Sequence, residues 1–361
     1  MPNIWSSIRS KKKGSYDLSR LIDFRKRNEF PPSTGSYQVI CDIDKTYLET
    51  KFETFVDILQ VALEAATSKQ TVEGASDILM AARFGNIYQN DRSEWNGLHF
   101  VSSSPPQLRA VLEEKLMIDG LEWDSDTFKN QAYNLLKGKM GLLRQHLAYK
   151  SAAILNIAKD FAPNSNVIFI GDNAESDPMI YLGAAQLLNG GMSSAQYFDY
   201  LKQGGVDEPT IENFAKILPE LPRLNVQGII IRNAPGYNRK IPTFLNSFVR
   251  TVDHFFEMAF LMHNIGLFSA DVLVKLTKDL HNFYAIDRGY LCSVIEAAGV
   301  GREESSYVET LKKCFAVIKS DSELSWKKDV SRDLSPFRYQ TFNNLAHEDI
   351  NRFAKEWTAS H

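Results

Sequence analysis

Four short apolar runs, each followed by a polar or glycine-containing loop, constrain the fold of this chain more than any other feature. The runs are YQVICD (37–42), LHFVS (98–102), VIFIG (167–171) and VQGIII (226–231). Helical patterns lie between them, including residues 104–116 and 150–161, the second of which we expect to begin at Lys150. Buried strands alternating with helices predict an α/β fold, with a parallel sheet covered by helices on both faces and ligands bound at the carboxyl ends of the strands.

The chain changes character at about residue 241, after which we find no strand pattern. Apolar residues at 244, 248, 252, 255, 259 and 262 predict a helix with Thr243 as N-cap and Gly266 at its end. Further helices are expected over residues 269–287, 289–299 and 305–319. We therefore predict an all-helical C-terminal module over residues 241–361. An α/β core over residues 36–240 precedes it, with helical insertions at about 186–222 and, as a lid of two helices, at 53–68 and 72–85.

Residues 1–35 form a basic arm. They contain eight Lys and Arg against three Asp and Glu, a local charge of 8 − 3 = +5. We expect a solvated extension, and the functional alternative is attraction to an anionic membrane surface or an acidic partner.

Composition excludes several classes. The formal charge of −3 over the whole chain argues against nucleic-acid binding, which normally needs a basic excess. Three cysteines, Cys41, Cys292 and Cys314, favour a reducing compartment. The amino terminus lacks the apolar run of an ordinary secretory signal. We expect a soluble, cytoplasmic protein, and an effector delivered into a host cell would have the same composition.

Acidic residues follow two of the predicted strands. Asp42 ends the first run and Asp44 follows two residues later, and alternation along an extended segment lets both carboxylates face one pocket. Asp172 and Asp177 follow the third run and, in a parallel sheet, lie at the same edge. A polar turn is the simpler interpretation of either pair alone. Four converging carboxylates without His or Cys, however, predict a site for Mg²⁺.

Two further residues complete an ordered series. Ser102 ends the second run, and Lys150 precedes the third. Each alone is weak, because Ser-Pro is an ordinary helix start and a lone lysine is usually a surface residue. The order of the four elements is far more specific than any one of them.

This order resembles the haloacid dehalogenase (HAD) superfamily of phosphohydrolases. More narrowly, CDIDKTYLET, LHFVSSSPPQL, YKSAAI and VIFIGDNAESDPMIY are similar to the catalytic domain of actin-patch-associated phosphatidate phosphatases and their bacterial relatives. The resemblance covers about residues 36–235 and implies a Rossmann-like core and a Mg²⁺-dependent phosphatase. It implies that Asp42 is the nucleophile that forms an aspartyl-phosphate and that Asp44 is the general acid and base. Ser102 and Lys150 would bind the phosphoryl group, while Asp42, Asp44 through its carbonyl, Asp172 and Asp177 would hold Mg²⁺.

Three positions depart from the family's usual pattern. Lys45 stands where the family usually has Asp, Pro106 where it has Trp, and Asn173 where it has Ser. The substrate, a phosphorylated lipid, protein or small molecule, is therefore left open. Two other classes stay as alternatives: a non-catalytic phosphate-binding module, and a partner-docking or membrane-docking function of the helical tail.

Overall fold

In the computed structural model of the chain, a mixed sheet forms the centre of the protein. The structure describes residues 21–30, 33, 35–49, 70–85, 95–130, 139–284, 286–318, 333–337 and 345–359. Within these ranges seven strands form one sheet in the order β1-β4-β3-β2-β5-β6-β7. Their bounds are β1 Ile22–Lys26, β2 Tyr37–Asp42, β3 Gly97–Ser102, β4 Ser125–Lys129, β5 Asn166–Asp172, β6 Asn225–Arg232 and β7 Val249–Val252. All neighbouring pairs are parallel except β1 with β4, so the predicted α/β fold is confirmed.

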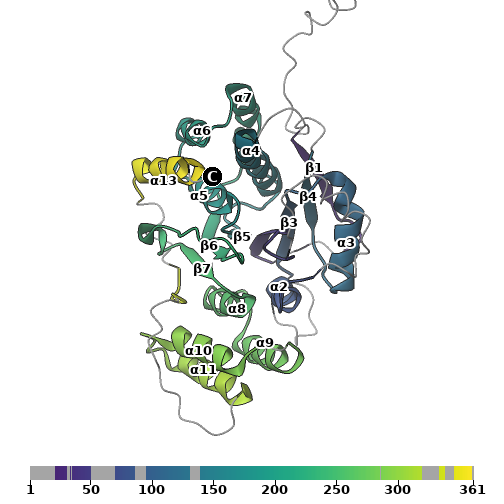
Figure 1. Ribbon diagram of the computed structural model, residues 1–361, viewed down its shortest axis with the longest axis vertical. Helices are drawn as coiled ribbons and strands as arrows, with labels where there is room; N and C mark the ends of the chain where they lie inside the picture. The colour runs from purple at the N-terminus through teal and green to yellow at the C-terminus, as the bar shows by residue number, and fades with distance from the viewer. Residues whose placement is uncertain are drawn as a thin grey trace, which may run out of the picture.

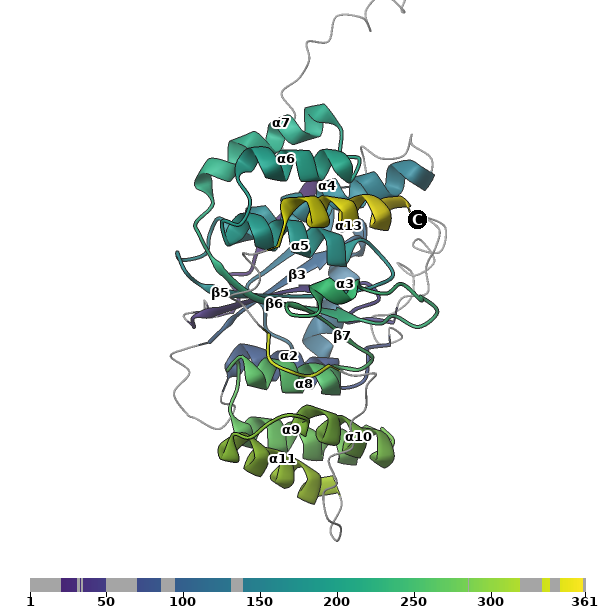
Figure 2. The same ribbon diagram turned by 90° about the vertical axis from the view of Figure 1, so that its left-hand side faces the viewer.

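Helices cover both faces of the sheet (Figures 1 and 2). On one face lie α4 Lys139–Ala158, α5 Asp177–Leu188, α6 Ser194–Gln203, α7 Glu208–Ile217 and α13 His347–Ala359. On the other lie α2 Ala75–Phe84, α3 Arg109–Ile118 and α8 Phe255–Asn264, with α9 Ala270–Phe283, α10 Arg288–Gly299 and α11 Ser305–Ile318 beyond them. Short 3₁₀ turns span Pro106–Leu108, Leu218–Glu220 and Thr243–Leu245.

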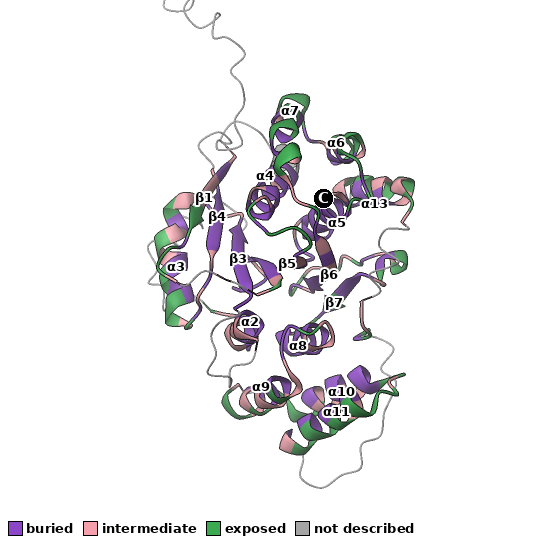
Figure 3. Ribbon diagram, turned by 180° about the vertical axis from the view of Figure 1, so that it is seen from behind, coloured by how far each residue is buried: buried purple, intermediate pink, exposed green. Residues whose placement is uncertain are grey.

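Side-chain alternation divides the strands between two hydrophobic clusters. Cys41 and Ile170 face the cluster that contains α8, whereas Ile40 and Phe169 face the one that contains α4 and α5. The sheet is therefore buried on both faces, as its colour in Figure 3 shows, which explains why its central strands are continuously apolar instead of alternating. Cys41 is a buried core residue.

Several predicted helices are confirmed. α3, α9, α10 and α11 occupy the expected ranges, and Ser269 caps α9 by accepting a hydrogen bond from Val272 N. The expected insertion near 186–222 contains α6 and α7. Of the two lid helices, 53–68 lies outside the described residues. The other is α2, which packs against β3, α8 and α9 and so covers a sheet face instead of forming a lid.

Other sequence-based expectations are wrong. Residues 249–252 form β7, so a strand does follow residue 241, and the helix expected from Thr243 begins at Phe255 with His254 as its cap. α4 begins at Lys139, so Lys150 lies inside the helix instead of opening it. Among the described residues after 245, the regular elements are helices apart from β7. Since β7 extends the sheet of the core, the division at residue 240 stays a prediction.

The basic arm is also more than an extension. Residues 22–26 form the edge strand β1, which pairs with β4. Arg25 and Arg27 form ion pairs with Glu113, and Arg27 stacks on the ring of Trp123. Arg25 and Arg27 therefore have partners within the fold. No described helix has both the length and the apolar character that crossing a membrane requires.

Candidate active site

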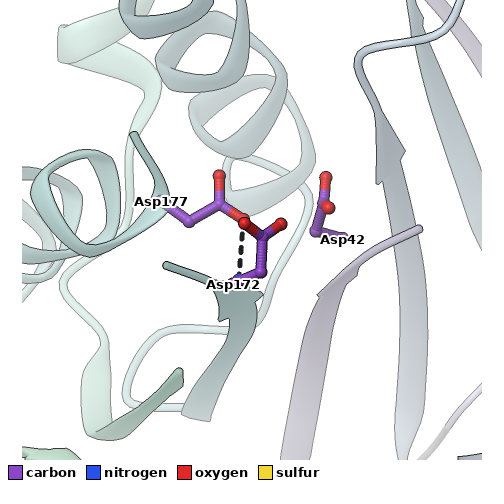
Figure 4. Close-up of side chains that lie close together, drawn as sticks. All are labelled: Asp42, Asp172 and Asp177. Atoms are coloured by element: carbon purple, nitrogen blue, oxygen red, sulfur yellow. Dashed lines mark hydrogen bonds between the residues drawn. The ribbon is translucent and has the colours of Figure 1, made fainter. Parts of the chain in front are cut away.

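Three buried carboxylates meet at the carboxyl ends of the two central strands. Asp42 is the last residue of β2, Asp172 is the last of β5, and Asp177 is the first of α5. A carboxylate oxygen from each lies within 4.8 Å of those from the other two, and Figure 4 shows the side chains converging. β2 pairs with β3 on one side and β5 on the other. After β2 the chain adds β3 and β4 on one side and then returns to add β5 on the other side. Ligands of α/β sheets bind at such a switch point.

Lys150 joins these carboxylates from α4. Its ammonium lies 2.8 Å from Asp42 Oδ1, 2.5 Å from Asp177 Oδ1 and 3.2 Å from Glu175 Oε2. The side chains of Lys150, Asp42 and Asp177 are completely buried. An ammonium so placed offsets part of the mutual repulsion of the carboxylates and holds them in position.

Asp44 belongs to a neighbouring group of hydroxyls. Ser102 Oγ donates to Asp44 Oδ2 at 2.7 Å, and Ser104 Oγ lies 3.1 Å from Asp44 Oδ1. Its carboxylate is not part of the buried group formed by Asp42, Asp172 and Asp177 in the described residues. Three carboxylates therefore converge where the sequence predicted four, and Asp44 faces the end of β3. Its expected role as a metal ligand through the backbone carbonyl stays a prediction.

The loop between Asp172 and Asp177 is fixed by its own carboxylate. Asp172 Oδ1 accepts hydrogen bonds from Ala174 N at 2.6 Å and from Glu175 N at 3.1 Å. Thr46 Oγ1 lies 3.3 Å from Asp42 Oδ2 and 3.4 Å from Asp172 Oδ2, so one hydroxyl bridges the two strand ends. Backbone N–H groups thereby hold the Asp172 carboxylate, and the Thr46 hydroxyl links it to that of Asp42.

Glu175 is a site residue to which sequence reasoning gave no role. Its carboxylate lies 3.2 Å from both Lys150 Nζ and His146 Nδ1, and 3.9 Å from Lys45 Nζ. The charges of Lys150 and Lys45 and the hydrogen bond with His146 together outweigh desolvation and hold the pKa of Glu175 well below its usual value. Lys45 adopts a left-handed backbone with φ of 58°, an uncommon conformation for a residue other than glycine. For Lys45, the only sequence signal of a place in the site was a lysine directly after Asp44.

The electrostatics of the three aspartates favour a bound cation. Burial raises the pKa of Asp42 well above its ordinary value and that of Asp172 to about 8, and the neighbouring carboxylates add to both shifts. Asp42 Oδ1 is buried, and Lys150 Nζ at 2.8 Å is its charged partner. A hard divalent cation would compensate the charge of the three converging carboxylates, and an all-carboxylate donor set suits such an ion. The residues present therefore fit a divalent metal.

Fold and site together define an α/β domain with a buried carboxylate group at the carboxyl ends of its central strands. Residues 37–192 match the family model described as phosphatidate phosphatase APP1, catalytic domain. The match covers less than half of the chain but includes Asp42, Asp44, Ser102, Lys150, Asp172 and Asp177. It confirms the resemblance proposed from the motifs and is consistent with the HAD assignment. No curated protein and no solved structure matches the chain.

Proposed function

We propose that the protein is a Mg²⁺-dependent HAD-type phosphatase that hydrolyses a phosphate monoester through an aspartyl-phosphate on Asp42. The observation that carries this proposal is the buried group formed by Asp42, Asp172 and Asp177 with Lys150 at 2.8 Å from Asp42. The family match over residues 37–192 supports the same chemistry.

Asp42 is the nucleophile in this proposal. One of its carboxylate oxygens attacks phosphorus in line with the ester oxygen, so an O–P bond to Asp42 forms as the bond to the leaving group breaks. Lys150 balances the charge of Asp42 and of the phosphoryl oxygens. Ser102 lies at the end of the neighbouring strand β3 and supplies a hydroxyl to a phosphoryl oxygen or to Asp44.

Asp44 handles the protons. It protonates the departing ester oxygen and then takes a proton from the water that hydrolyses the aspartyl-phosphate. The hydroxyls of Ser102 and Ser104 hold its carboxyl in one orientation. A fixed orientation is what general acid and base catalysis requires of a single group acting in both steps.

The metal ligands would be Asp42, Asp172 and the backbone carbonyl of Asp44, with Asp177 in support. A bound Mg²⁺ supplies positive charge that allows an anionic nucleophile to approach an anionic phosphate. The absence of His and Cys from the buried group Asp42, Asp172 and Asp177 favours Mg²⁺ over zinc.

The family resemblance favours a phosphorylated lipid of the phosphatidate type as substrate. Phosphoproteins and small phosphorylated metabolites are the second candidate class, because Lys45 and Pro106 depart from the family's usual residues next to the site. A non-catalytic phosphate-binding module is the third, and the presence of both Asp42 and Asp44 argues against it.

The decisive experiment combines a substrate panel with trapping of the intermediate. Phosphatidate, phosphoinositides, phosphopeptides and sugar phosphates are assayed with Mg²⁺ and with excess EDTA. Asp42→Asn keeps the shape of the nucleophile and removes its charge, so turnover should fall by about 10⁴-fold or more while the fold is retained. Rapid acid quenching should leave phosphate on Asp42 of the wild type. Activity in excess EDTA, or turnover by Asp42→Asn at the wild-type rate, would contradict the proposal.

A further inference from the structure

A buried lysine at the end of β4 lies beside the candidate site, and its ammonium forms no direct ion pair among the described residues. Lys129 is the last residue of β4, its backbone N–H donates to Ser104 O at 3.2 Å, and the residue is 3% exposed. Because β3 and β4 are parallel neighbours, Lys129 lies at the same sheet edge as Ser102. It thus borders the serine loop that holds Asp44.

The alternation of β4 fixes the face on which Lys129 lies. Ser125, Thr127 and Lys129 share one face of the strand, and Ser125 Oγ contacts His99, whose ring packs on Phe161 just beyond α4. α4 covers this face of β4. The Lys129 side chain therefore lies between β4 and α4, the helix that carries His146 and Lys150.

Glu175 is the carboxylate whose charge raises the pKa of Lys129, but it already has other partners. Glu175 contacts Lys150, His146, Lys45 and Ser103 Oγ, the last at 3.1 Å. Lys129 forms no ion pair or hydrogen bond through its ammonium among the described residues. In addition, residues 130–159 contain five Lys and Arg and no Asp or Glu, so the chain that follows β4 offers no carboxylate.

This ammonium keeps its charge despite burial. Desolvation lowers the pKa of Lys129 to about 8, which still leaves most of the group protonated at pH 7. A buried charge without a partner is unfavourable. Among the described residues, Glu175 offsets part of that cost through space and without a direct contact, and an anionic ligand would relieve the rest.

We propose that Lys129 binds an anionic group that the substrate carries in addition to the phosphate ester that is hydrolysed, such as a carboxylate or a second phosphate. β3 separates β4 from β2, and adjacent strands are about 4.8 Å apart, so the two strands are about 10 Å apart. Asp42 is level with Val101 and Thr127, so Lys129 lies two residues further along β4. Lys150 already serves the phosphoryl position next to Asp42. Lys129 is thus placed for a second anion at the flank of the site, with Ser103 and His146 on the same side.

This inference rests on the proposed phosphatase function, and two readouts test the second-anion subsite separately from the phosphatase activity. The first is hydrolysis of paired esters with full-length protein and Mg²⁺: nitrophenyl phosphate against its carboxylated analogue, and phosphatidate against diacylglycerol pyrophosphate in mixed micelles. The second is calorimetric binding of methylenebisphosphonate against methylphosphonate at fixed free Mg²⁺, which needs no turnover. The soluble and the micellar pairs distinguish a small bis-anion from a lipid headgroup as the source of the second charge.

In each pair, the wild type should prefer the compound that carries the additional anionic group. Lys129→Met should lower kcat/KM for that member by about 10- to 100-fold and change the other by less than about threefold. Lys129→Arg should retain most of the preference. Lys202→Met, which removes an exposed lysine of α6, serves as the matched control and should behave as the wild type.

Each other outcome is decisive. Equal losses on both members of a pair would place Lys129 at the transferring phosphate and overturn the inference, and so would no loss on either. If Lys129→Met fails to fold, the wild-type binding preference for the bisphosphonate still decides, because its absence would also overturn the inference. A bisphosphonate preference without hydrolysis of any ester would retain the subsite and reject the phosphatase.

Discussion

The family-matched segment and the region after it contribute to the site in different ways. Residues 37–192 supply every predicted catalytic side chain: Asp42, Asp44 and Ser102 lie at or just after strand ends, and Lys150 lies within α4. The later region supplies support: Asn173 of the acidic loop bonds to Ala234 N, and Trp357 Nε1 of α13 donates to Glu175 O at 3.2 Å. The chemistry is therefore local in sequence, whereas the support of the loop comes from a helix about 180 residues away.

The largest effect that we expect in this comparison comes from Asp44, within the matched segment. Asp44→Asn removes the proton donor and should lower turnover of alkyl phosphates by about 10³-fold, because a poor leaving group needs protonation. A nitrophenyl ester, whose leaving group is stable as an anion, should lose much less. Rates for a series of esters test this, and an equal loss across the series would assign Asp44 another role.

A second large effect should come from Asp172. Asp172→Asn keeps an oxygen that can accept from Ala174 N and Glu175 N, so the loop should persist while the metal loses a carboxylate ligand. We expect the Mg²⁺ concentration for half-maximal activity to rise by about 100-fold. A Mg²⁺ titration of activity measures the change. Wild-type Mg²⁺ dependence in this variant would show that Asp172 is not a ligand.

The strands differ in how well the sequence reveals them. β2, β3, β5 and β6 are predictable because burial on both faces demands apolar runs. β4, SDTFK, is equally buried but polar, since Asp126 pairs with Arg109 and Ser125 contacts His99. β7 has only four residues, one of them Arg250. It lies among apolar residues spaced as in a helix, so the sequence pattern does not reveal it.

The same distinction applies to the site. Asp42, Asp44, Asp172 and Asp177 could be placed at one edge from strand direction alone. Glu175 and Trp357 could not, because their contacts depend on how α4 and α13 pack on the sheet. No periodic pattern along the chain encodes such a contact.

A moderate effect is expected from the C-terminal helix. Trp357→Phe keeps an aromatic ring against Phe353 but removes the hydrogen bond to Glu175 O. One lost neutral hydrogen bond should lower kcat by about 3- to 10-fold and raise the Mg²⁺ requirement, with KM little changed. Phe353→Leu, which changes packing without touching the loop, should lower thermal stability but not the Mg²⁺ requirement. If both variants titrate with Mg²⁺ like the wild type, α13 has no role in positioning the loop.

The smallest effect on chemistry should come from the basic N-terminus. Because β1 begins at Ile22 and pairs with β4, a deletion must stop at residue 20, which removes five Lys and Arg against one Asp, or 5 − 1 = +4. If the substrate lies in an anionic bilayer, each basic residue that reaches the surface adds about 1 kcal/mol, screened by salt. The truncated protein should then bind anionic vesicles more weakly at low salt and hydrolyse a soluble ester at the unchanged rate. Equal vesicle binding by both forms, or none by either, would assign the N-terminus no membrane role and would favour phosphoproteins or metabolites as substrates.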